Sequence, residues 1–139
     1  MSIEENKALV RRFFDEIWNK VNLNIVDQLC ATNFTFDYAP SGMSNDLEGY
    51  KQTGIIWTSG ISEMKVTLED IVAEVDKVAV RWKVGCKHTG EFMGVPPTSK
   101  QLSMLGISIF RIEGGKIAEE WGEMDMMGLM QQLGVVGSG

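Results

Sequence analysis

The strand expected to start at Lys116 carries the side chains best suited to chemistry in this chain. Strand side chains alternate with a period of two, so one face is predicted to hold Ile117, Glu119, Trp121, Glu123 and Asp125. Desolvation beside an indole and several methionines makes a carboxylate a better proton acceptor at neutral pH. Asp125 is therefore a candidate acid/base group. The alternative is that these acids form the solvated face of an edge strand.

His88 is the only histidine, and it ends the apolar face of a strand predicted from Val78 to His88. An imidazole can donate a proton or a hydrogen bond near neutral pH. If consecutive strands pair as hairpins, His88 and Asp125 lie late on strands of the same direction, and we expect them at one mouth. The alternative is a structural histidine satisfied within the core.

Further residues are candidates for the wall of a substrate pocket. Asp37 lies between two aromatic residues, either as a second pocket carboxylate or as a solvated strand residue. The apolar candidates, which would otherwise be ordinary core, are Trp57, Trp82, Trp121 and Met104. The methionines after the last strand can form an adaptable ligand wall, fill the core or make a dimer contact.

Several other chemistries are disfavoured by the motifs. A single histidine and two cysteines, Cys30 and Cys86, without ligand spacing argue against a catalytic zinc site. No G-x-S-x-G motif or Cys/His pairing supports a covalent hydrolase. The loop from Gly94 to Lys100 lacks the end of a phosphate-binding loop. Proton transfer by a carboxylate is the chemistry that remains.

The predicted helices precede most of the predicted strands along the chain. Ser2 and Glu5 match a capping box. Asn24 is a candidate cap of a second, short helix that includes Cys30, and Asp46 is a candidate cap of a third helix through about Trp57. Strands are predicted near 34–38, 64–75, 78–88, 101–112 and from 116. This order predicts an α+β fold with N-terminal helices packed on a curved, mainly antiparallel sheet.

Composition bounds the class of protein. The chain has 139 residues, 44% of them hydrophobic, which predicts a single domain over residues 1–139. A net charge of −6 argues against a nucleic-acid partner. An acidic N-terminus and the lack of a long apolar run argue against a signal peptide or a membrane span, so we expect a cytoplasmic protein. Residues 137–139 are predicted to be a frayed tail.

The chain resembles the SnoaL-like polyketide cyclases, also called ester cyclases, of the NTF2-like superfamily. The resemblance runs through Glu5–Phe14, Asp76–Trp82, His88–Thr98, Phe110–Ile117 and Glu119–Gly134. The most specific part is the H-T-G-x-F-x-G-x-P-P-T run at His88, together with the W-x-x-x-D ending at Asp125.

The resemblance implies a cone-shaped barrel, dimeric through the open face of its sheet, with no metal or organic cofactor. It implies ring closure of a hydrophobic polyketide-type ester by intramolecular aldol chemistry. Asp125 would move the proton, and His88 would hold the enolate or carbonyl oxygen. One departure is Asp37, which stands where the family commonly has a histidine.

A related NTF2-like isomerase that works by enolisation is an alternative with the same acid/base chemistry. Two rival functions of other kinds also stay open. Epoxide hydrolysis, known in the same superfamily, uses paired carboxylates and an arginine. The lack of an Arg-x-Asp pair near Arg111 counts against it. The second rival is a non-catalytic module that binds a small molecule in the same cone.

Overall fold

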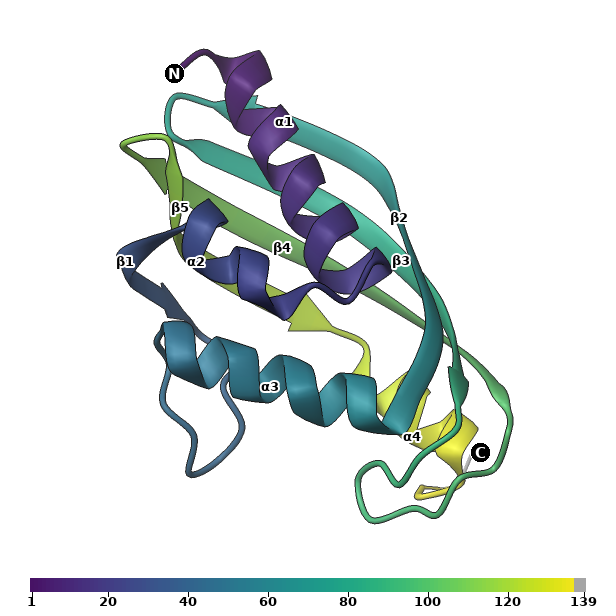
Figure 1. Cartoon of the computed structure of the whole chain (residues 1–139). Coiled ribbons are helices and arrows are strands. Elements are labelled where there is room, and N and C mark those ends of the chain that lie inside the picture. Colours follow the sequence, from purple (N-terminus) through teal and green to yellow (C-terminus); the bar gives the residue numbers. More distant parts are fainter. Residues whose placement is uncertain (137–139) are drawn as a thin grey trace.

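Helices cover one face of a five-stranded sheet with strand order β1-β5-β4-β3-β2 (Figure 1). The computed structural model describes residues 1–136, and the predicted tail at 137–139 lies outside the described part. The elements in chain order are α1 (Ile3–Phe13), a π-helical turn (Phe14–Asn19), a 3-10 turn (Leu23–Ile25), α2 (Val26–Leu29), β1 (Cys30–Phe36), α3 (Leu47–Gly60), β2 (Ile61–Glu74), β3 (Lys77–His88), β4 (Gln101–Glu113), β5 (Lys116–Met124) and α4 (Met126–Leu133).

Two of the three predicted helix caps are confirmed. Ser2 and Glu5 form the capping box of α1, with both backbone-to-side-chain hydrogen bonds at 3.0 Å. Asp46 caps α3 by accepting from the N–H of Gly49 at 3.0 Å. The cap predicted at Asn24 is wrong, because this residue lies inside the 3-10 turn.

Cys30 was expected in a helix, and this expectation is also wrong. The helical stretch α2 is one turn long and ends at Leu29. Cys30 has an extended backbone and pairs with Ile117 of β5. Because β1 runs parallel to β5 while the other pairs are antiparallel, the sheet is mixed.

A bulge in β5 decides which of its side chains face the helices. Ile112 pairs with Ile117, but the preceding Arg111 pairs with Glu119, so β5 holds one extra residue. An extra residue reverses the alternation of the strand. The predicted common face of β5 is therefore wrong beyond Ile117, and the buried acid of this strand is Glu120.

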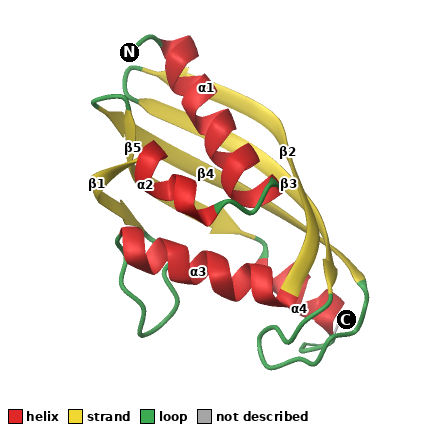
Figure 2. Cartoon of the chain, in the orientation of Figure 1, coloured by secondary structure: helices red, strands yellow, loops and turns green. Residues whose placement is uncertain are grey.

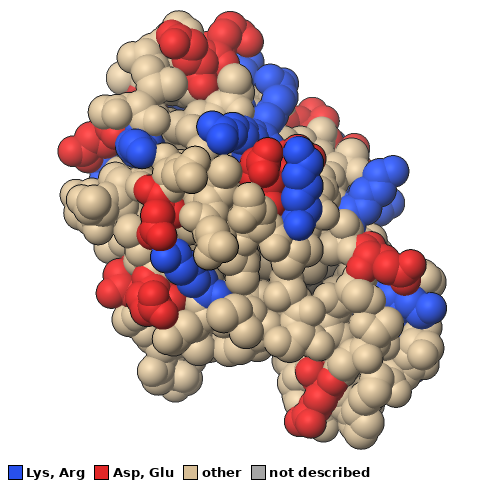
Figure 3. Space-filling view, viewed as in Figure 1, with Lys and Arg blue, Asp and Glu red and all other residues tan. Residues whose placement is uncertain are grey.

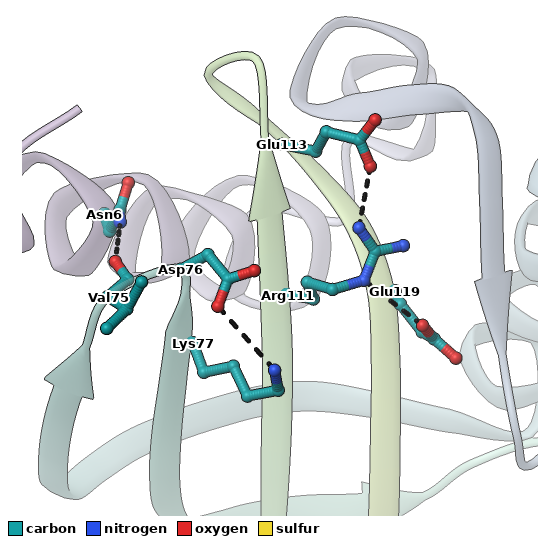
Figure 4. Close-up of polar contacts among 7 residues, drawn as sticks. All are labelled: Asn6, Val75, Asp76, Lys77, Arg111, Glu113 and Glu119. Atoms are coloured by element: carbon teal, nitrogen blue, oxygen red, sulfur yellow. Dashed lines mark hydrogen bonds and ion pairs between the residues drawn. The ribbon is translucent and has the colours of Figure 1, made fainter.

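The close-up of the β4–β5 hairpin shows the contact that Glu119 makes with Arg111 (Figure 4). The Arg111 guanidinium donates to Glu113 at 2.7 Å and to Glu119 at 3.4 Å. The same view shows the Asn6 amide donating to the carbonyl of Val75 at 3.2 Å, which joins α1 to the β2–β3 turn.

An aromatic cluster around Tyr50 joins the helices to the sheet. The ring of Tyr50, on α3, lies 5.7 Å from Phe13 of α1 and 5.5 Å from Phe34 of β1. Phe13 also contacts Phe110 of β4 edge-on, with ring centroids 5.2 Å apart. Edge-to-face packing at these distances is favourable beyond burial alone. The cluster holds α1, α3 and β1 at fixed positions above β4.

The opposite face of the sheet carries no helix within the described residues, as Figure 2 shows. Three apolar side chains of β4 lie there, with exposed fractions of 55% for Leu105, 52% for Ile107 and 39% for Ile109. On the helical face, basic side chains lie among acidic ones (Figure 3), as in the Lys51–Asp27 pair at 2.6 Å. No helix within residues 1–136 is long and apolar enough to cross a membrane.

Gly106 of β4 leaves the space that the Trp82 indole occupies. A Cβ at residue 106 would collide with the six-membered ring of Trp82, whereas a Cβ at Gly85 of β3 would meet no atom within 4 Å. We expect Gly106→Ala to lower the free energy of unfolding by about 1–3 kcal/mol through overpacking. Gly85→Ala is the matched control and should be neutral or slightly stabilising. Urea unfolding of both variants measures this; equal stabilities would contradict it.

Candidate active site

A cavity of about 80 Å³ lies between the helices and the sheet. Its wall is mostly apolar and contains three tryptophans and three methionines: Trp18, Trp57, Trp82, Met64, Met104 and Met124. Unbranched methionines adjust easily to the shape of a ligand. The polar exceptions are Tyr38, from the segment after β1, Ser108, from β4, and Glu120, from β5.

Glu120 is the buried acid of this cavity, with 3% of its surface exposed. The Tyr38 hydroxyl donates to its Oε1 at 2.7 Å. The hydroxyls of Ser108 and Tyr50 also stabilise the ionised carboxyl group. The carboxyl group thus has one direct hydroxyl donor, Tyr38, and two further hydroxyls that favour its charge.

Burial raises the pKa of Glu120 from its usual value of 4.5 to about 7. Desolvation is the largest cause, and the negative charge of Asp37 adds to it. The three hydroxyls act in the opposite direction because they stabilise the ionised form. Near neutral pH, Glu120 is therefore able both to accept and to donate a proton.

Two indole groups orient the hydroxyls around Glu120. The Trp82 indole donates to Ser108 Oγ at 3.0 Å, and the Trp18 indole donates to Tyr50 Oη at 3.1 Å. A hydroxyl whose oxygen accepts from an indole has its own proton free to donate onward. Burial and the charge of Glu120 hold the pKa values of Tyr38 and Tyr50 well above their usual range, so both phenols stay neutral donors.

The structure places three of the predicted pocket residues in the cavity wall: Trp57, Trp82 and Met104. Trp121 does not line this cavity, because the β5 bulge turns its side chain to the opposite face, where it pairs with Ile109. Asp37 is exposed and accepts a hydrogen bond from the N–H of Gly122 at 2.9 Å.

Asp125 lies outside the cavity wall as an exposed residue. Its carboxylate accepts from the N–H of Gly128 at 2.9 Å and caps α4. β5 ends at Met124, which pairs with Gly106 in the middle of β4, so Asp125 lies beside that part of β4. His88 lies beyond the other end of the pairing, next to Lys87, which pairs with Gln101 at the start of β4. The two residues are therefore several residues apart along the sheet. The fold does not bring Asp125 and His88 together at one mouth.

His88 is fully buried and does not line the cavity. The N–H of Thr98 donates to its Nδ1 at 3.3 Å, and the Thr98 hydroxyl lies 2.9 Å from the same nitrogen. An Nδ1 that accepts from a backbone N–H leaves the proton of the neutral ring on Nε2. Nε2 has no hydrogen-bond partner among the described residues.

Four residues of the cavity wall were not among the predicted site residues: Glu120, Tyr38, Ser108 and Trp18. Ser108 and Tyr38 carried a readable signal, because each continues an alternating apolar face with a polar group. Glu120 carried none, since its orientation depends on the bulge. Within residues 1–136, no three His, Cys, Asp or Glu side chains converge as a metal site requires.

Solved structures of other proteins share this fold. The solved structure of TsrD from Streptomyces laurentii is similar with a TM-score of 0.87 and 26% identity, over 98% of this chain and 99% of that chain. The structure of AclR from Streptomyces galilaeus, a proposed hydroxylase, is similar with a TM-score of 0.84 and 28% identity, over 99% of this chain and 86% of that chain. The structure of IdmH from Streptomyces antibioticus, a proposed polyketide cyclase, is similar with a TM-score of 0.79 and 28% identity, over 93% of this chain and 98% of that chain.

These similarities confirm the predicted NTF2-like α+β fold. No curated protein of known function matches the sequence. The model of the SnoaL-like polyketide cyclases matches residues 8–133, which include every element that lines the cavity. The chain therefore belongs to the SnoaL-like polyketide cyclase family.

Proposed function

We propose that this protein is an acid/base enzyme that acts on a hydrophobic small molecule in the cavity, with Glu120 as the proton-transfer group. The observation that carries the proposal is the buried Glu120 carboxyl, whose pKa is raised to about 7 by an apolar wall. Membership of a cyclase family supports ring closure by aldol chemistry as the reaction.

The proposed steps use only groups that lie at the cavity. The ionised Glu120 takes a proton from a carbon next to a substrate carbonyl, so the C–H bond breaks and an enolate forms. As Glu120 becomes protonated, its charge no longer holds the hydroxyl proton of Tyr38, and the Tyr38 and Ser108 hydroxyls can turn to donate to the enolate oxygen. The enolate carbon then attacks a second carbonyl of the same substrate. The resulting alkoxide takes the proton back from Glu120.

Asp125 and His88 stay predictions as catalytic residues. Glu120 is favoured over Asp125 because it is buried at the cavity, while Asp125 is exposed and occupied as a helix cap. His88 is buried outside the cavity wall, and its Nε2 has no hydrogen-bond partner among the described residues.

The Glu120 assignment predicts the behaviour of two amide variants. Glu120→Gln should slow deuterium exchange at the α-carbon of phenylacetone, a neutral one-ring ketone, by about 100-fold or more, the usual contribution of a general base. Asp125→Asn should exchange at the wild-type rate, because asparagine also caps helices. Proton NMR in D₂O measures both rates.

The two variants separate the hypotheses. Slow deuterium exchange with Asp125→Asn, together with the wild-type exchange rate with Glu120→Gln, would assign the acid/base role to Asp125. Ligand binding with no exchange above the background rate in the wild type would favour the non-catalytic module.

The raised pKa of Glu120 also predicts a pH-dependent stability. Folding favours the protonated form, so this contribution is present below about pH 4.5 and is lost as the pH rises through about 7. Relative to Glu120→Gln, the wild type should lose roughly 2–3 kcal/mol of unfolding free energy between pH 5 and pH 8. Urea unfolding at both pH values measures the difference. A constant difference would show that Glu120 is not shifted.

We also propose a homodimer through the uncovered face of the sheet. Leu105, Ile107 and Ile109 form an exposed apolar surface there, and such surfaces mark association sites. Ile107→Lys should convert the dimer to a monomer in sedimentation velocity. Ile55→Lys, at a comparably exposed position on α3, is the control and should leave the dimer intact. A monomeric wild type would refute the proposal.

A further inference from the structure

The cavity contains a buried carboxyl group without a cation to pair with it. Within the described residues, no lysine, arginine or histidine lines the cavity, and Glu120 takes part in none of the ion pairs. The charge that acts on Glu120 is the negative one of Asp37, which raises the pKa of Glu120 further. Burying a carboxylate without a charged partner is costly, and an incoming positive charge would remove that cost.

The rest of the wall is also suited to a positive charge. Trp18, Trp57 and Trp82 line the same cavity as Glu120, and Tyr38 lies beside the carboxyl group. Aromatic faces attract cations, tryptophan most strongly, and the attraction grows when the cation is desolvated.

We propose that the cavity binds a planar ring that carries a positive charge, such as a protonated or alkylated ring nitrogen, paired with the Glu120 carboxylate and packed against the tryptophans. The inference rests on the proposed function in using the same cavity, and it extends that function by naming the charge of the ligand. A positive charge conjugated with the reacting carbon would also make its C–H more acidic. A carboxylate ligand would instead face Glu120 with no cation nearby.

The size of the cavity favours a single ring. A space of about 80 Å³ is below the range of about 300–1,000 Å³ typical of drug-sized ligand pockets. Movement of Met64, Met104 or Met124 would enlarge it for a substituent.

A charge series of one-ring probes tests the inference. N-methylpyridinium and toluene have the same shape and differ in charge, and benzoate supplies the anion. At pH 8 we expect N-methylpyridinium to bind about tenfold more tightly than toluene or more, and benzoate to bind least. The indole N–H signals of Trp18 and Trp82, both hydrogen-bonded beside Glu120, report binding by NMR titration.

The Glu120→Gln variant is the control, because glutamine keeps the size of the side chain and removes its charge. It should bind N-methylpyridinium and toluene about equally. In the wild type, affinity for the cation should also rise as the pH passes through about 7, while that for toluene stays constant. Equal binding of the three probes, a preference that persists in Glu120→Gln, or unchanged indole signals would overturn the inference. Exchange of the neutral ketone tests the proposed function separately, so failure of one does not imply failure of the other.

Discussion

The chemistry of the cavity rests on the burial of one carboxyl group, that of Glu120, among aromatic and apolar side chains. Burial penalises its charge, and three hydroxyls, from β4, α3 and the segment after β1, partly offset that penalty. The outcome is a pKa of about 7, between the values of a solvated acid and an isolated buried one. This pKa results from the apolar wall, the hydroxyls and the charge of Asp37 together. Since these groups come from several elements, no single segment of the chain forms the site.

The hydrogen bonds around Glu120 continue into the core. Trp82 can donate to Ser108 because Gly106 leaves space for its ring, and Trp18 can donate to Tyr50 from the π-helical turn after α1. Tyr50 is also the centre of the aromatic cluster that holds α1, α3 and β1 together. The same side chains therefore stabilise the fold and orient the donors of the site.

The two faces of the sheet have separate roles. The helical face encloses the cavity, while the other face exposes the apolar side chains of β4. Because of the β5 bulge, two neighbouring acids of the last strand lie in different environments: Glu119 contacts Arg111 on the uncovered face, and Glu120 lines the cavity on the helical face. A pair of neighbouring glutamates thus has unlike chemistry because of one extra residue in the strand.

The α+β class, the capped helices α1 and α3, the long strands and the family could all be predicted from the sequence, because hydrophobic periodicity and capping motifs are local. The sequence also indicated that Trp57, Trp82 and Met104 line the cavity. The acid of the site could not be predicted in this way, because its identity depends on how the strands pair. A strand register depends on its partner, and the mismatch between Arg111–Glu119 and Ile112–Ile117 is not visible in β5 alone. Burial, which sets the chemistry of Glu120, is likewise a property of packing between segments far apart in the chain.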